Sequence, residues 1–79
     1  MSEKLYKIFS KVMNVTIDDI NDDSSPTTIS NWTSFIGYVL LYELETNFNV
    51  KFSIDEAMDV KNVADIKRHL QNHGVNLND

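Results

Sequence analysis

The 79-residue chain contains no cysteine, one proline and two glycines, and only seven of its residues are lysine or arginine. Without cysteine the chain forms no disulfide, no thiolate metal site and no thiol nucleophile of its own. The shortage of basic side chains argues against nucleic acid as a partner, because Lys and Arg supply the affinity for phosphate backbones. Twelve acidic residues give a net charge of −5, so basic protein surfaces are the better partners.

Long apolar runs are also missing. The longest one, residues 35–42, is far shorter than the about 20 residues that a membrane-spanning helix needs, so we expect no membrane span. Residues 1–5 lack the charged-then-apolar layout of a signal peptide, and we therefore expect a cytoplasmic protein. A chain this short supports one hydrophobic core, which predicts a single domain over residues 1–79 and, given its acidity, a monomer. A compact core leaves little room for a deep substrate pocket, so we do not expect an enzyme.

Hydrophobic periodicity and capping signals predict three longer helices. Apolar residues recur at three- and four-residue intervals over residues 2–14, which is typical of an amphipathic helix. A second helix is predicted over residues 34–48, with Thr33 as its N-cap. A last helix begins after Asn62 and ends near Gly74. Its predicted buried face consists of Val63, Ile66 and Leu70.

A short helix and a long loop complete the expected fold. Ser53 and Glu56 have the spacing of a capping box, which predicts a short helix through Met58. Residues 21–31 are rich in Asn, Asp, Ser and Thr, and we interpret them as a loop. Thr16 and Asp19 suggest another capping box. The expected attachments of the linker and the loop to the core are Ile17, Ile20, Ile29 and Trp32. No convincing strand is present, so the prediction is an all-α, small four-helix bundle.

Ser34 lies where the polar loop meets the most apolar segment of the chain. A hydroxyl at the first turn of a helix is close to free backbone N–H groups and to the positive end of the helix dipole. This position suits a covalent anchor for an anionic group better than a catalytic nucleophile. Serine is also common at helix starts for purely structural reasons, and that interpretation stays open.

The order of these parts resembles an acyl carrier protein. The segment Thr33-Ser34-Phe35 is similar to the family's Asp-Ser-Leu motif, and Trp32 resembles a subset of carriers with Trp-Asp-Ser-Leu. Residues 44–52 resemble the family's Leu-Glu-Glu-Glu-Phe stretch and the aliphatic residue that follows it. Residues 53–56 and 60–66 resemble its third helix and the entry to its fourth. The resemblance covers nearly the whole chain, and residues 32–66 are its most specific part.

The resemblance implies a carrier whose serine, here Ser34, is esterified by 4′-phosphopantetheine from coenzyme A. The thiol of that arm then holds acyl groups as thioesters, as in fatty-acid biosynthesis and other lipid metabolism. The implied partners are a phosphopantetheinyl transferase, an acyl- or aminoacyl-loading enzyme and thioester-processing enzymes. The carrier itself is implied to have no catalytic residues.

Four residues around Ser34 are expected to contribute to partner recognition: Thr33, Phe35, Ile36 and Val39. Thr33 stands where the family has aspartate, and Phe35 replaces its leucine. Ile36 and Val39 occupy positions that are often acidic in fatty-acid carriers. These differences favour a specialised carrier whose cargo is an amino acid, a short acyl group or a lipid chain.

The apolar segment, residues 35–42, is interpreted mainly as core. A single helix does not bury every side, however, so Ile36 or Val39 is a candidate for an exposed docking patch. The rival functional interpretation is a helical adaptor that is not modified and binds a protein partner through the second helix.

Two other patterns are interpreted as structural. His69 and His73 have the spacing of metal ligands on a helix, but a third ligand is missing, so we expect no metal site and solvated histidines. Four aspartates, Asp18, Asp19, Asp22 and Asp23, lack the glycine turn and terminal glutamate of a calcium loop. We interpret them as caps and loop solvation.

Overall fold

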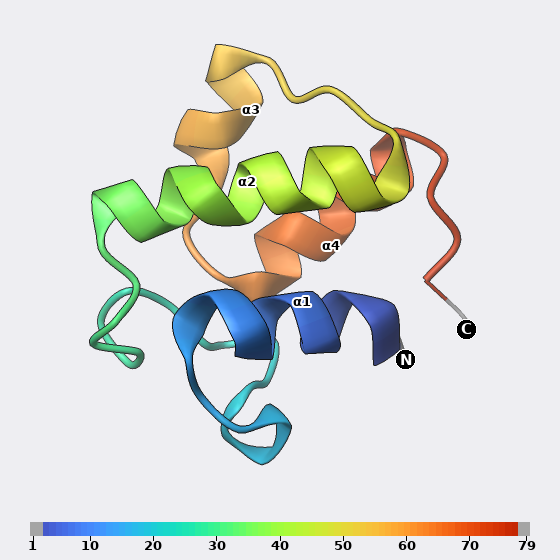
Figure 1. Ribbon diagram of the computed structural model, residues 1–79. Coiled ribbons are helices and arrows are strands. Elements are labelled where there is room, and N and C mark those ends of the chain that lie inside the picture. Colours follow the sequence, from blue (N-terminus) through green and yellow to red (C-terminus); the bar gives the residue numbers. More distant parts are fainter. Residues whose placement is uncertain (1–2, 78–79) are drawn as a thin grey trace.

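The computed structural model describes residues 3–77 and shows an all-helical chain (Figure 1). Within that range the α-helices are α1 (Glu3–Met13), α2 (Ser34–Phe48), α3 (Ile54–Asp59) and α4 (Val63–Asn72), with a 3₁₀ turn, η1 (Ile17–Asp19), after α1. No strand occurs among the described residues. The prediction of a small helical bundle with three longer helices and one short helix is confirmed. None of the helices in this part of the chain has the length and hydrophobicity needed to cross a bilayer.

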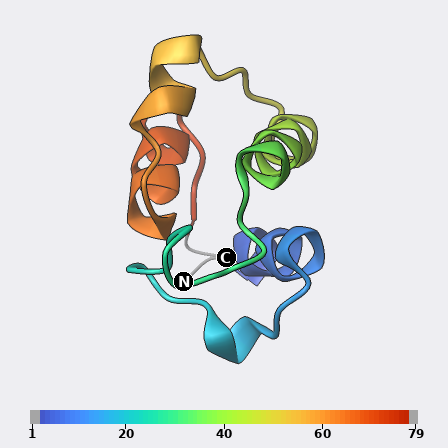
Figure 2. The ribbon, with the colours of Figure 1, turned by 90° about the vertical axis from the view of Figure 1, so that its left-hand side faces the viewer.

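The helices surround one core. α1 and α2 lie side by side and run in opposite directions (Figure 1). Seen along their axes, α1 and α2 form one side of the molecule, and α4 faces them across the core (Figure 2). α3 runs across the direction of α2 (Figure 1). The connection between α1 and α2 passes below α1 and returns to the start of α2, so the loop determines where Ser34 lies.

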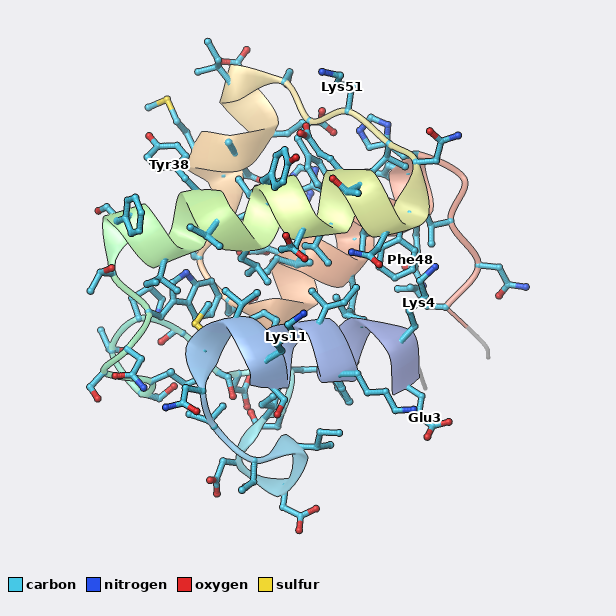
Figure 3. All side chains as sticks on the ribbon, in the orientation of Figure 1. Glu3, Lys4, Lys11, Tyr38, Phe48 and Lys51 are labelled. Carbon is cyan, nitrogen blue, oxygen red and sulfur yellow. The ribbon has the colours of Figure 1, made fainter. Side chains whose placement is uncertain are left out.

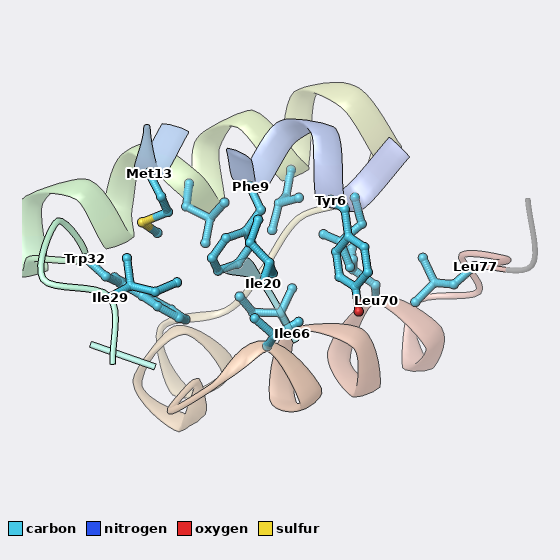
Figure 4. Close-up of a cluster of buried hydrophobic side chains, with 13 residues drawn as sticks. Tyr6, Phe9, Met13, Ile20, Ile29, Trp32, Ile66, Leu70 and Leu77 are labelled. Atoms are coloured by element: carbon cyan, nitrogen blue, oxygen red, sulfur yellow. The ribbon is translucent and has the colours of Figure 1, made fainter. Parts of the chain in front are cut away.

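Buried apolar side chains from all three longer helices and the loop fill this core (Figure 4). Its centre contains an edge-to-face pair of Phe9 and Trp32, whose ring centroids are 5.1 Å apart. The prediction that Ile20, Ile29 and Trp32 attach the linker and the loop to the core is confirmed. The same prediction for Ile17 is wrong, because its side chain is 41% exposed on the outer side of η1.

Local capping explains where α2 begins and ends. The Thr33 hydroxyl accepts a hydrogen bond from the Ile36 backbone N–H at 3.2 Å, which confirms Thr33 as the N-cap. At the other end Asn49 adopts a left-handed conformation (φ 55°), which ends the helix. α2 therefore occupies the predicted residues, and Ser34 is its first residue.

The caps of α3 and α4 also follow the sequence. Ser53 and Glu56 form both hydrogen bonds of a capping box before α3. The Asn62 side chain accepts from the Asp65 N–H at 2.9 Å and caps α4. Gly74, just beyond α4, has a φ of 87°, a conformation that glycine adopts at little cost.

The capping box predicted at Thr16 is wrong. Its hydroxyl donates to the Asp19 carboxylate at 2.9 Å and accepts no backbone N–H. The physical reason is that η1 is a single 3₁₀ turn of three residues, too short to present the free N–H groups of an α-helix.

Backbone groups tie the loop to the rest of the bundle. The carbonyl of Ser24 accepts from the Val63 N–H, and that of Asp22 from the Ala64 N–H, each at 3.0 Å. These bonds satisfy two first-turn donors of α4. The Asn31 side chain donates to the Met13 carbonyl at 2.9 Å. The loop is thus fixed at both α1 and α4 before it enters α2.

Candidate functional site

Ser34 is exposed at the start of α2, and its hydroxyl forms no hydrogen bond with any residue of the described range. Its neighbour Thr33 has the capping role, so the Ser34 side chain is not required for helix initiation. The hydroxyl of Ser34 is accessible to another molecule without loss of a cap.

Two backbone donors flank this hydroxyl. In the first turn, the N–H groups of Ile36 and Gly37 bond to Thr33, whereas those of Ser34 and Phe35 have no backbone acceptor within residues 3–77. Free N–H groups and the helix dipole favour an anion at this position by about 0.3–1 kcal/mol for an exposed site. No charged side chain lies in the first turn of α2 to compete for them.

An apolar groove of about 660 Å³ begins at Ser34 and lies between α2 and α3. The loop and α2 contribute one wall, which includes Trp32, Gly37 and Leu41. α3 and its C-terminal end contribute the other wall, which consists of Ile54, Ala57, Met58 and Val60. Gly37 lets the indole of Trp32 come close, since a Cβ at that position would lie 3.3 Å from Trp32 Nε1.

Large apolar side chains are exposed on α2 and α3, and three of them, Tyr38, Ile54 and Met58, line the groove. Phe35, Tyr38 and Tyr42 of α2 are 65–73% exposed, and Ile54 and Met58 of α3 are 76–79% exposed. Tyr38 lies on the side of α2 that faces α3 (Figure 3). The interpretation of residues 35–42 as mainly core is therefore wrong for its aromatic members. Leu40 and Leu44 form the buried stripe of α2 instead.

The structure also changes the expected docking patch. Ile36 and Val39 are half-buried, and Ile36 packs against the core. Phe35 and Thr33 are exposed, as partner recognition would require. The exposed aromatic face of α2 is therefore made by Phe35, Tyr38 and Tyr42, three and seven residues apart along one side of the helix.

No general base lines the groove next to Ser34. Among its lining residues, none is a histidine, carboxylate, lysine or arginine. Both histidines lie on or just after α4, where they contact α3. The expectation of solvated histidines is wrong for His69, which is buried and lies 2.9 Å from the Asp59 carboxylate through Nε2. The described residues contain no cluster that would hold a metal ion.

Charged side chains connect α3 to α4. Arg68 donates to Asp59 at 2.7 Å and to Asp65 at 3.2 Å. The hydrogen bond from Arg68, followed by that from His69, lowers the pKa of Asp59 below its ordinary value. The Ser53 backbone N–H lowers the pKa of Glu56, with a further contribution from His73. Each carboxyl group is thus kept ionised by donors within or beside these two helices.

No protein-family model matches this chain, and no curated protein matches it either. Support for a function therefore comes from the residues and their geometry. The position of Ser34 at the start of the second helix was predicted from the sequence because a loop-to-helix transition is a local signal. The groove was not, because its α3 wall is separated from Ser34 by twenty residues and its position depends on tertiary packing. The one available signal was that the first half of α2 is apolar nearly all round, which requires some of it to be exposed.

Proposed function

We propose that the protein is an acyl or aminoacyl carrier that is modified with 4′-phosphopantetheine at Ser34. The observation that carries this proposal is the exposed hydroxyl at the first residue of α2, which lines an apolar groove and has no hydrogen-bond partner within residues 3–77. The resemblance of residues 32–66 to acyl carrier proteins supports the same residue.

The surroundings of Ser34 fit such a group. The free N–H groups of Ser34 and Phe35 would bind the oxygens of a phosphodiester on the serine. The arm would supply the thiol that this cysteine-free chain lacks. The groove beside it offers apolar walls, which favour an acyl chain over a charged cargo.

The proposed carrier acts on nothing by itself. Its hydroxyl has no histidine or carboxylate within the groove lining to remove its proton, which supports a substrate role for Ser34 rather than a nucleophilic one. The proposed partners are a phosphopantetheinyl transferase, a loading enzyme and enzymes that process the thioester. Thr33 and Phe35 are exposed next to Ser34 and are proposed to contact these enzymes.

A second candidate is an unmodified adaptor that binds a protein through the second helix. The exposed aromatic face formed by Phe35, Tyr38 and Tyr42 favours it, because large exposed apolar patches often mark protein interfaces. Thr33, in place of the aspartate of carriers, favours it as well.

Intact-mass measurement separates the two candidates. The protein is incubated with coenzyme A and a broad-specificity phosphopantetheinyl transferase, in parallel with Ser34→Ala and Ser30→Ala. Ser30 is an exposed loop serine four residues upstream and serves as the matched control. We expect one phosphopantetheine on the wild type and on Ser30→Ala, and none on Ser34→Ala. Absence of modification with every transferase tried, including one from the source organism, would reject the carrier and leave the adaptor.

A further inference from the structure

Trp32 contributes a hydrogen-bond donor to the groove between α2 and α3. Its side chain is only 6% exposed and lies at one end of the core, where its ring packs edge-on against Phe9 (Figure 4). The indole Nε1–H forms no hydrogen bond with any of residues 3–77. In this part of the chain no unpaired side-chain nitrogen or oxygen is fully enclosed, so Nε1 reaches the surface of the protein. Trp32 lines the groove, and the donor therefore opens into it.

Gly37 keeps the approach to this N–H open. A Cβ at Gly37 would lie 3.3 Å from Trp32 Nε1, and Gly37 also lines the groove. Gly37 lies inside α2 and does not have a positive φ, so the backbone conformation does not require glycine at this position. Inside a helix glycine is less favourable than alanine. What glycine provides here is free space beside the indole N–H.

The rest of the groove lining is mostly apolar and has no charged side chain. Its other polar side chains are those of Thr33 and Ser34 at the start of α2 and of Tyr38, which is 70% exposed. A volume of about 660 Å³ lies within the range of sites for small molecules. The ligand that suits such a groove is neutral and largely apolar, and it carries a hydrogen-bond acceptor where it meets Trp32.

The indole N–H also determines which oxygen suits it. An indole nitrogen is a donor only, so a hydrocarbon chain that covers it removes its access to solvent without supplying an acceptor. A hydroxyl oxygen accepts the bond, but its own O–H then faces the apolar walls. A carbonyl oxygen accepts the bond and brings no donor of its own. A ketone group therefore matches the groove better than an alcohol or a plain alkyl chain.

We propose that the groove binds a neutral aliphatic chain with a carbonyl oxygen, and that the Trp32 Nε1–H is the donor that selects it. The site is present whether or not Ser34 carries a group. On a carrier loaded through Ser34, the same donor favours an oxo-acyl cargo over a saturated one, a consequence that rests on the function proposed above.

NMR titration of the unmodified, ¹⁵N-labelled protein with 2-hexanone tests this site. Trp32 is the only tryptophan, so its indole N–H gives a single resonance of known origin. We expect 2-hexanone to shift this resonance in a saturable manner and to show an intermolecular NOE between the N–H and the methyl group next to the carbonyl. The matched alcohol, 2-hexanol, should bind about fivefold more weakly, because its O–H is left without an acceptor.

Three variants determine whether the indole N–H causes the preference. Trp32→Phe keeps an aromatic ring but removes the donor, so it should weaken 2-hexanone binding about fivefold and leave the binding of 1-hexene unchanged. Gly37→Ala places a methyl group beside Nε1 and should also weaken 2-hexanone binding, and it decides the matter if Trp32→Phe does not fold. Tyr38→Phe removes the exposed hydroxyl of the groove lining and should keep the full affinity for 2-hexanone.

Three results would overturn the proposal. They are an indole resonance that does not respond to 2-hexanone, equal affinities for 2-hexanone and 2-hexanol, and full ketone affinity in a folded Trp32→Phe or Gly37→Ala variant. Because the titration uses the unmodified protein, these results leave the attachment of phosphopantetheine at Ser34 untouched. Equally, a Ser34 that no transferase modifies leaves the ketone site standing.

Discussion

At the start of α2, Thr33 caps the helix and Ser34 presents an exposed hydroxyl. The Thr33 hydroxyl caps the helix through the Ile36 N–H, while the neighbouring Ser34 side chain is exposed and its hydroxyl forms no hydrogen bond with the described part of the chain. In a chain where Ser34 itself capped the helix, esterification of that hydroxyl would remove the cap. Here the cap would survive esterification of Ser34, because the cap belongs to the preceding residue.

Substitution of Thr33 tests this division. Thr33→Asp preserves a good N-cap and places the family's residue next to Ser34, so we expect unchanged stability and faster transfer of phosphopantetheine. Thr33→Ala removes the side-chain acceptor and should lower the free energy of unfolding by about 1 kcal/mol. Urea denaturation measures the stability, and a time course of intact mass measures the transfer rate. An unchanged or slower rate in Thr33→Asp would show that Thr33 does not limit recognition by the transferase.

Single-residue signals were the most predictable part of the fold. The caps at Thr33, Ser53 and Asn62 were read correctly, because a cap depends on residues only three positions apart. The burial of His69 was not predicted. It depends on Glu56 and Asp59, which reach the histidine only after α3 has folded back beside α4.

At the scale of elements, α2 is the least typical helix. Leu40 and Leu44 are buried towards the core, whereas Phe35, Tyr38 and Tyr42 are exposed on another side. Because nearly all of these residues are apolar, hydrophobic periodicity does not show which side faces the core. The contacts with α1 decide it. The same all-round hydrophobicity explains why α2 provides both a core stripe and a groove wall.

Two side-chain truncations in α2 test which side of the helix is buried. Leu44 has no exposed surface, so Leu44→Ala should lower the free energy of unfolding by about 2–5 kcal/mol. Tyr42, two residues before Leu44, is 65% exposed. Tyr42→Ala should therefore change the free energy of unfolding by no more than about 0.5 kcal/mol. Urea denaturation of both variants provides the comparison. A Tyr42→Ala variant as unstable as Leu44→Ala would mean that the aromatic face is packed against the protein.

The end of α2 has a polar contact with α1. The Lys4 ammonium lies 4.8 Å from the centre of the Phe48 ring and donates to the Asn47 carbonyl at 2.7 Å (Figure 3). On the opposite side of α1, Tyr6 and Asp22 both bind the Lys67 ammonium, at 2.7 and 2.6 Å. These contacts fix α1 against the end of α2 and the middle of α4.

At the scale of the whole molecule, α4 supplies the cations of several ion pairs. The chain has seven basic and twelve acidic residues, and two of the basic residues, Lys67 and Arg68, lie on α4. Arg68 and the histidines attach α3, while Lys67 attaches α1 and the loop. α4 therefore links α1, the loop and α3 through its charged side chains.

Acid should weaken these connections. The Arg68 hydrogen bond lowers the pKa of Asp59, and the Lys61 backbone N–H does the same for Asp65. A carboxyl group with a lowered pKa contributes stability above its ordinary pKa and loses it as the pH falls through the lowered value. We therefore expect the urea midpoint to fall between about pH 5 and 3.

The variant Asp59→Asn has no carboxylate at this position to protonate. Its urea midpoint should therefore fall less steeply with decreasing pH than that of the wild type. Asp55→Asn, an exposed change on the same helix, is the control and should decline as the wild type does. Acid also reduces the repulsion among the acidic groups of this chain, and this effect is nearly the same in all three proteins. Comparing the proteins at the same pH therefore isolates the contribution of Asp59. Equal slopes in the wild type and Asp59→Asn would show that the Asp59 contacts with α4 contribute nothing to acid sensitivity.

The central claim is that Ser34 is the attachment site of a phosphopantetheine arm. Peptide mass spectrometry on the protein purified from its own cells tests this claim most directly, because the native transferase has then acted. We predict that the peptide spanning Ser34 carries one phosphopantetheine and that fragmentation places it on Ser34. An entirely unmodified Ser34 peptide, from cells in which other carriers are modified, would contradict the claim.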